Sequence, residues 1–322
     1  MGTRLEGTAG DRRVGESADE QDGFPIWLRW TLLTLVLWGI WAVLSKGIPP
    51  DGPDALSPAQ IQTVSTLGIL PVLVLLFLTR EPRDPRRSPA YGFYLAFCGG
   101  LISALGNLPY YDLLNHSKAS SIVPLTSLYP LVTVLLAVGF LRERLNGLQR
   151  IGIPVSLLAI YLLNVREEGP LAGDSLLLAL APVVSWGVAG LLQKVATNHA
   201  PPVGCAYWFL LAFVPVGLVM KTADPPPSVQ ENVFLIAVCI GFTMALGNYT
   251  ILRAFAMGGK ASVIAPLGSL YPLVSIPLAI YYWHERVTGR EAAGIVCALL
   301  SVVLLAWETN GSSVPSGTAA DG

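Results

Sequence analysis

The sequence predicts an all-α, polytopic membrane protein with ten transmembrane helices, arranged as two inverted five-helix repeats. Three observations predict this fold: the chain carries little charge, its apolar residues gather in ten long runs, and its two halves resemble each other. Of the 322 residues, 53% are hydrophobic and only 13% are charged, whereas a soluble protein carries about 25% charged residues. So little charge cannot coat a water-soluble chain of this length, and we expect a lipid environment.

Composition also excludes several classes of protein. The net charge is −1, so the chain has no overall field that would attract nucleic acid. The four cysteines lie in apolar runs without a CxxC spacing, which excludes a disulfide scaffold. There is no Walker A, HExxH or GxSxG motif, and the three histidines are far apart in the sequence. We therefore expect no enzyme, no metal, no cofactor and no nucleic-acid partner.

Ten apolar runs each approach the ~20 residues that a helix needs to cross about 30 Å of hydrocarbon. They lie at residues 26–46, 60–79, 91–113, 120–141, 147–165, 174–194, 203–220, 233–254, 262–283 and 290–307. The runs are too long for barrel strands and lack alternation of period two. Helices satisfy every backbone group within the segment, as lipid requires. The polar ends, residues 1–25 and 308–322, are expected to be disordered cytoplasmic tails.

The distribution of lysine and arginine favours an N-terminus in the cytoplasm, because the segments on that side then hold most of these residues. The bias comes from the first half of the chain, and the second half is nearly balanced. Ten crossings return the C-terminus to the same side. No signal peptide is recognisable, and we expect a multi-pass protein of the bacterial inner membrane or plasma membrane.

The strongest pattern is an internal repeat. Residues 118–153 and 260–295 share 19 of 36 positions without a gap, including KAS and SLYPLV in both. Trp-Gly and Lys at the first run of each half also match, as does Gly-Asn in the third. The repeats are predicted at residues 26–165 and 174–307.

Because each repeat has five helices, an odd number, the second must enter the membrane from the opposite side. Inverted repeats are common among secondary transporters, whose substrate site lies between the copies near mid-bilayer. The sequence therefore predicts transport by alternating access. A membrane scaffold or lipid-interacting subunit without a transport cycle is the alternative, and the sequence leaves a homodimer open.

The repeated motif KAS-x-I-x-PL-x-SLYPLV, followed by Glu-Arg and then G-x(4)-GI, resembles the EamA-type domain of the drug/metabolite transporter superfamily. The resemblance covers both halves. It implies ten helices with both ends inside, and a secondary transporter that moves a small amino acid-like or drug-like metabolite, most often by export. Relatives that exchange sugar phosphates or nucleotide sugars leave that alternative open.

Polar and aromatic residues inside the predicted spans are the candidates for substrate binding, because such groups are costly in lipid unless they have partners or a function. Most occur in matched pairs, one from each repeat. The candidate substrate contacts are Trp38, Trp41, Asn107, Tyr110, Ser127, Tyr129, Trp186, Asn248, Ser269 and Tyr271, and the helix-breaking or gating prolines are Pro124, Pro130, Pro266 and Pro272. Each role has a packing alternative, in which tryptophans fill space, asparagines pair between helices and prolines only kink them.

The prolines predict irregular fourth and ninth helices near Ser-Leu-Tyr-Pro, because proline removes a backbone donor and clashes with the preceding turn. Ionisable residues lie near the ends of the spans. We expect Lys46 and Lys194 to extend toward the interface, and the recurring Glu143-Arg144 and Glu285-Arg286 to form gate or end-cap ion pairs. Asp112 and His116 leave an outer proton relay open.

Overall fold

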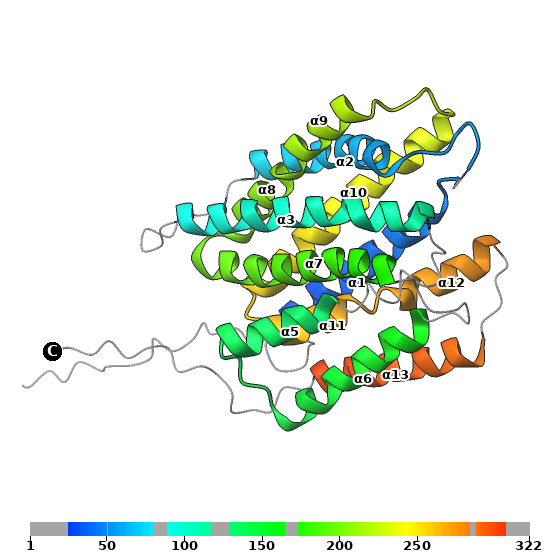
Figure 1. Ribbon diagram of the computed structural model, residues 1–322. Helices are drawn as coiled ribbons and strands as arrows, with labels where there is room; N and C mark the ends of the chain where they lie inside the picture. Colours follow the sequence, from blue (N-terminus) through cyan, green and yellow to red (C-terminus); the bar gives the residue numbers. More distant parts are fainter. Residues whose placement is uncertain are drawn as a thin grey trace, which may run out of the picture.

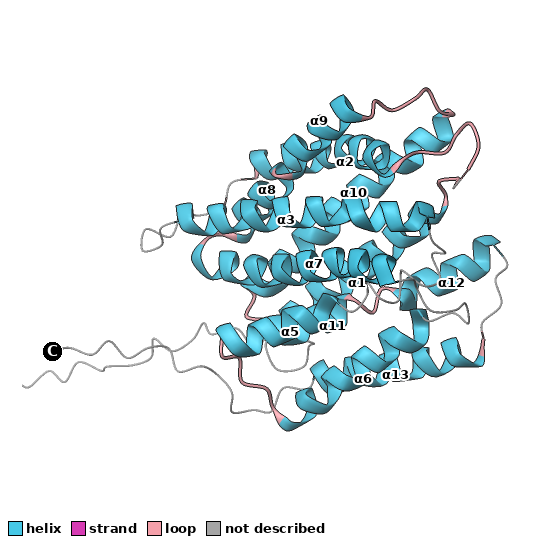
Figure 2. Ribbon diagram, viewed as in Figure 1, coloured by secondary structure: helices cyan, strands magenta, loops and turns pink. Residues whose placement is uncertain are grey.

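The computed structural model describes residues 25–49, 51–79, 81, 89–116, 129–164, 173–283 and 288–306, and these contain helices and short connections without a β-strand (Figure 2). The helices are α1 (Ile26–Lys46), α2 (Pro58–Leu78), α3 (Pro89–His116), α5 (Tyr129–Phe140), α6 (Gly147–Asn164), α7 (Gly173–His199), α8 (Pro202–Leu211), α9 (Phe213–Ala223), α10 (Glu231–Ala256), α11 (Ala261–Gly268), α12 (Pro272–Trp283) and α13 (Gly289–Ala306). Each falls on a predicted apolar run. The predicted tails and part of the run at 120–141 lie outside the described residues.

Within the described part, five helical segments are long and apolar enough to cross a membrane: Ile26–Ser45, Pro58–Leu78, Pro89–Asp112, Pro202–Ala223 and Glu231–Ala256. Shorter apolar helices accompany them. Large apolar side chains point outward from these helices, and Phe77, Leu78 and Phe140 are each at least 70% exposed. An exposed apolar surface of this kind is stable in contact with lipid.

Two predicted spans are interrupted. The ninth run divides into α11 and α12, with a turn at residues 269–271 directly before Pro272, which is the interruption that the proline predicts. Pro266, by contrast, lies inside α11 and is buried. The seventh run divides at Ala212, and Pro215 in the first turn of α9 permits this break because it cannot donate to the carbonyl of residue 211.

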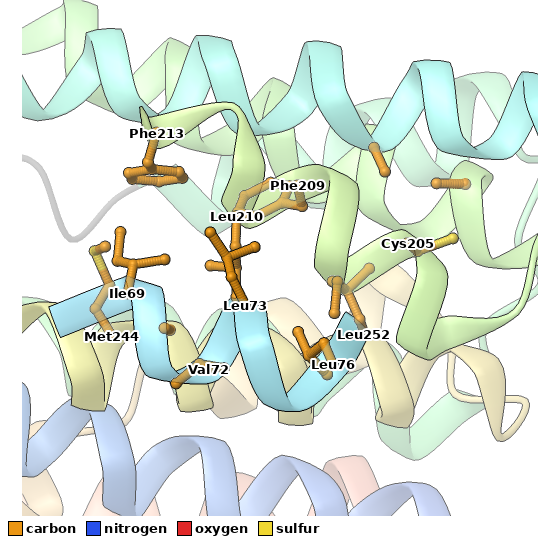
Figure 3. Packing of buried hydrophobic residues seen from close by; sticks show 14 of the residues in the cluster. Ile69, Val72, Leu73, Leu76, Cys205, Phe209, Leu210, Phe213, Met244 and Leu252 are labelled. Atoms are coloured by element: carbon orange, nitrogen blue, oxygen red, sulfur yellow. The ribbon is translucent and has the colours of Figure 1, made fainter. Parts of the chain in front are cut away.

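The helices pack around two large apolar clusters. In Figure 3, side chains of α2 such as Ile69 and Leu73 face Phe209 and Leu210 of α8, with Met244 of α10 close by. The second cluster joins α1, α6, α11 and α13, and α6 and α13 lie side by side at one edge of the molecule (Figure 1). These clusters surround the middle of the bundle, where the polar residues described below are found.

Glycines let helices approach closely at corresponding positions of the two halves. Gly100 in α3 and Gly241 in α10 each stand seven residues before the asparagine of their helix. A Cβ on Gly241 would lie 1.7 Å from the carbonyl oxygen of Ser65, and one on Gly100 would lie 2.0 Å from that of Phe209. Backbone therefore packs directly on backbone where α10 crosses α2 and where α3 crosses α8.

A second pair of glycine contacts joins the first helix of each half to the other half. A Cβ on Gly39 of α1 would lie 2.5 Å from the Cβ of Val274 in α12. A Cβ on Gly187 of α7 would lie 2.5 Å from the Cβ of Val132 in α5. The two halves are thus interleaved, since α1 packs against α12 and α7 packs against α5.

We predict that Gly100→Ala and Gly241→Ala each destabilise the protein by about 1–3 kcal/mol, because the added methyl group has no space and the helices must separate. Thermal unfolding of the purified protein in detergent measures the effect. Gly139→Ala is the matched control, because a Cβ at Gly139 meets nothing within 4 Å. Equal melting temperatures for all three variants would contradict the close backbone contacts.

Candidate functional site

A cavity of about 100 Å³ lies between the helices of the two halves. One buried water needs about 10–15 Å³ by the same measure, so the space exceeds a structural water site. The cavity is lined from α1, α3, α5, α7, α8, α10 and α11 and from the turn before α12. Its lining residues are Trp38, Trp41, Ser103, Asn107, Tyr110, Tyr129, Thr133, Trp186, Ala189, Gly190, Gln193, Phe209, Met244, Asn248, Ile251, Phe255, Ala265 and Tyr271.

Most of the candidate substrate contacts predicted from the sequence meet at this cavity. The residues that line it are Trp38, Trp41, Asn107, Tyr110, Tyr129, Trp186, Asn248 and Tyr271. Ser269 is fully buried behind it, where its hydroxyl is hydrogen-bonded to the phenol oxygen of Tyr129 (2.8 Å) and to the carbonyl oxygen of Ala265 (2.9 Å). Ser127 and Pro124 lie outside the described residues.

Pro130 and Pro266 do not belong to the described lining of the cavity. Pro130 is buried in the first turn of α5, and Pro266 is buried within α11. Pro272 is the first residue of α12. Pro130 follows Tyr129 and Pro272 follows Tyr271, so each proline is next to a tyrosine that lines the cavity.

The matched asparagines are both buried and both hydrogen-bonded to α7. Asn107 of α3 accepts a hydrogen bond from the indole N–H of Trp186 (3.1 Å) and donates to the side-chain oxygen of Gln62 (3.2 Å). Asn248 of α10 accepts from the side-chain amide of Gln193 (3.1 Å) and donates to the carbonyl of Met244 (3.0 Å). These bonds satisfy groups that would otherwise be costly to bury.

Gln193 and Gln62 were missed by the sequence analysis, which looked for polar residues matched between the two halves. When Lys46 is aligned with Lys194, the residue that corresponds to Gln193 in the first half is Ser45. Gln193 is therefore not matched by a second glutamine. Ser103 and Thr133 also line the cavity. Both glutamines could have been identified from the sequence by a simpler rule, because any carboxamide within an apolar run needs a hydrogen-bond partner.

Aromatic rings form much of the remaining wall. Trp41 stacks on Tyr110, with ring centroids 6.5 Å apart and an interplanar angle of 29°, and meets the ring of Tyr271 edge-on at 6.4 Å. Trp186 contacts Tyr110 at 5.2 Å and Tyr129 at 5.9 Å, both edge-on. Five rings from α1, α3, α5, α7 and the turn before α12 therefore follow one another around the cavity.

The described charged side chains do not line the cavity. Among its described lining residues there is no carboxylate, ammonium, guanidinium or imidazole. The ammonium of Lys194 donates to the carbonyls of Phe255 (3.1 Å) and Gly259 (2.7 Å) at the C-terminal end of α10, where a helix favours a cation. Arg253 forms an ion pair with Glu81 at 2.9 Å. The side chain of Lys46 lies outside the described residues, as does that of His116.

One end of the bundle is closed by contacts between the two halves. The carboxylate of Glu143, just after α5, accepts hydrogen bonds from the backbone N–H groups of Ala261 (2.8 Å) and Ser262 (2.9 Å) at the start of α11. Lys260 donates to the carbonyl oxygen of Arg144 at 2.7 Å. Glu143 therefore acts as a cap for a helix of the other half, and the matched Glu285-Arg286 lies outside the described residues.

Comparisons with known proteins agree with this architecture. The model of the EamA-like transporter family matches the chain at residues 25–165 and 174–307. An uncharacterised transporter of Archaeoglobus fulgidus is 26% identical over 202 residues, which make up 62% of this chain and 71% of that protein. A probable amino-acid metabolite efflux pump of Salmonella typhimurium is 26% identical over 131 residues, covering 40% of this chain and 41% of the pump.

A solved crystal structure shares the fold, with a TM-score of 0.71 and 18% sequence identity over 88% of this chain and 96% of that one. The family match confirms the resemblance indicated by the repeated motif, and it covers nearly all of the apolar part of the chain. The two relatives are named as an uncharacterised transporter and as a probable amino-acid metabolite efflux pump, and the described helices expose large apolar side chains of the kind that lipid accepts. The chain belongs to the EamA-like transporter family and is a multi-pass integral membrane transporter.

Proposed function

We propose that the protein is a secondary transporter built from two inverted five-helix repeats, at residues 26–165 and 174–307, and that it works by alternating access. The internal sequence identity supports the repeat, and so does the family match to each half. The paired glycine contacts at Gly39 and Gly187, and at Gly100 and Gly241, add support because both halves make the same contacts. An odd number of helices per repeat inverts the second copy.

The observation that carries the proposal is the central cavity, because corresponding residues of the two halves line it. Trp38 and Trp186 correspond, as do Asn107 and Asn248, and Tyr129 and Tyr271. A substrate in this space touches both repeats. It can be exposed to either side of the membrane when the two repeats exchange their conformations. A scaffold without a transport cycle would favour a fully packed centre.

Access to the cavity is limited at the end where α11 begins. Glu143 and Lys260 join the two halves there, and Lys194 joins α7 to the end of α10. In the proposed cycle, these contacts separate when the cavity opens at this end. Because the cationic groups of Lys194 and Arg253 are engaged with partners outside the cavity, a phosphate-bearing substrate is the less favoured alternative.

We further propose export of an amino acid-like or drug-like metabolite, in an inner or plasma membrane with both termini in the cytoplasm. A Salmonella relative named as a probable amino-acid metabolite efflux pump supports the direction and the substrate class. The excess of lysine and arginine in predicted inner segments supports the orientation.

Replacing Asn107 or Asn248 with Leu should abolish efflux while the protein is still inserted in the membrane. The melting temperature should fall as well, because the donor of Trp186 or Gln193 loses its acceptor. Each asparagine lines the cavity, and leucine can neither donate nor accept a hydrogen bond there. The measurement is comparative metabolomics of cells with and without the protein, followed by flux in proteoliposomes of the compounds that change.

Asn198→Leu is the control for these variants, because Asn198 lies on the exposed surface of α7 outside the cavity. Its efflux should match that of the wild type. Undiminished efflux by the Asn107 and Asn248 variants would remove these residues from the site. An unchanged metabolite profile on expression of the wild type would contradict transport itself.

Single cysteines placed in the two tails, at residues 10 and 315, should both be labelled from the cytoplasmic side by a membrane-impermeant thiol reagent. Ten crossings require the two ends to share a side. Labelling from opposite sides would contradict the even number of crossings.

A further inference from the structure

The indole N–H of Trp41 is buried and has no hydrogen-bond partner among the described residues, although Trp41 lines the cavity. Another indole donor at the cavity, that of Trp186, is satisfied by Asn107. Leaving a buried donor unsatisfied costs about 1–3 kcal/mol, and most such groups in native proteins have partners. A substrate bound in the cavity would explain the unpaired N–H of Trp41, if the substrate supplies the hydrogen-bond acceptor.

The donor is provided by one half of the protein only. Trp41 stands three residues after Trp38, and the corresponding residue in the other half, three after Trp186, is Ala189. Both Trp41 and Ala189 line the cavity. The site is therefore asymmetric, with an unpaired donor on α1 and a small side chain on α7, so a ligand bound through this donor has one preferred orientation.

The rings around this donor favour a flat ligand. Trp41 and Tyr110 are stacked, while Trp186 and Tyr271 present their rings at steep angles to these neighbours. Faces and edges of aromatic rings pack well on a planar conjugated group. Aromatic walls also attract cations, but an ammonium group has only donors and cannot satisfy the N–H of Trp41.

The charge of the lining argues against an anion as well. An ionised carboxylate or phosphate taken from water into the cavity would need a counter-charge to offset its desolvation. Two described basic residues that are close in sequence to lining residues have other partners: Lys194 binds the carbonyls of Phe255 and Gly259, and Arg253 binds Glu81. The described lining offers only neutral donors and acceptors, of which Gln193 and Asn248 are examples.

We propose that the part of the substrate that enters the cavity is an uncharged, planar group bearing a carbonyl-type acceptor, and that the indole N–H of Trp41 donates a hydrogen bond to this acceptor. The aromatic rings hold the plane of the group, and Trp41 sets its orientation. This inference rests on the proposed transport function, because it names the substrate class of the same cavity. Of the two classes proposed above, it selects a neutral drug-like molecule, since an amino acid carries both an ammonium and a carboxylate group.

Three probes of nearly equal size separate the charge classes: benzamide is neutral and carries a carbonyl, benzoate is an anion, and benzylammonium is a cation. Binding of each to the purified full-length protein in lipid nanodiscs is measured by isothermal titration calorimetry. We expect saturable binding of benzamide, and weaker binding of both charged probes. Trp41→Phe keeps a ring but removes the donor, and should weaken benzamide binding roughly threefold to tenfold, as expected for one hydrogen bond.

Trp208→Phe is the matched control. Trp208 is 38% exposed and packs against Phe93 and Phe97 outside the cavity, so removal of its N–H should leave benzamide binding unchanged. Tighter binding of benzoate or benzylammonium than of benzamide would overturn the substrate class, as would absence of saturable benzamide binding up to its solubility limit. Equal affinity of wild type and Trp41→Phe would overturn the role of the donor.

These failures are distinct from failure of the transport function. Efflux that depends on Asn107 and Asn248 would still stand if benzamide did not bind. Conversely, benzamide binding that depends on Trp41, in a protein whose expression changes no metabolite, would support the site and contradict transport.

Discussion

The hydrogen bonds from α7 to two buried asparagines are the contacts on which the centre of the molecule depends. Lipid supplies no partner to a carboxamide, so each must be satisfied within the protein. Trp186 bonds to Asn107 and Gln193 bonds to Asn248, each at 3.1 Å. The two donors are seven residues apart, about two helical turns, and so lie on one face of α7. This face holds α3 and α10 around the central cavity.

The remaining packing keeps that arrangement while joining the two halves. Helix α1 packs against α12, and α7 packs against α5, so neither half forms a separate body. Gly100 and Gly241 remove side chains where α3 crosses α8 and where α10 crosses α2. Small residues at helix crossings are how membrane proteins gain close packing without a hydrophobic driving force between helices. In the proposed cycle, the cavity changes sides when these interleaved halves shift, and the cap that Glu143 provides to α11 is released.

Much of the helical framework could be predicted from the sequence, because a span of apolar residues has few alternatives in lipid. The described helices start and end close to the predicted runs, as with α1 at Ile26–Lys46 and α6 at Gly147–Asn164. The break at Ala212 was not predicted. The corresponding proline of the other half, Pro71, lies within an uninterrupted α2, so the presence of a proline alone does not indicate a break. A proline permits a break, and the packing around it decides whether one occurs.

Matched pairs identified six residues of the lining, namely Trp38 and Trp186, Asn107 and Asn248, and Tyr129 and Tyr271, but most of the described lining is not paired in this way. Asn107 and Asn248 were found because both halves retain them, whereas Gln193 and the unpaired donor of Trp41 belong to one half each. Ser269 was expected at the cavity and instead bonds to Tyr129 behind the wall. Tertiary packing decides which side of a helix faces the cavity. The prolines near Ser269 predicted an irregular helix but did not indicate the direction of its side chains. Residues that differ between the two copies, such as Trp41 and Ala189, are therefore the ones that the repeat pattern could not identify as part of the site.

In the proposed transport cycle, one cavity between the two halves is exposed to each side of the membrane in turn. The most direct measurement places a single cysteine at Ser103, which lines the cavity, in a variant whose four native cysteines are replaced by alanine and that retains efflux. Membrane-impermeant thiol reagents are then applied from each side separately. Alternating access predicts that the cysteine at position 103 is labelled from both sides of a membrane that remains sealed. Labelling from one side only would contradict alternating access.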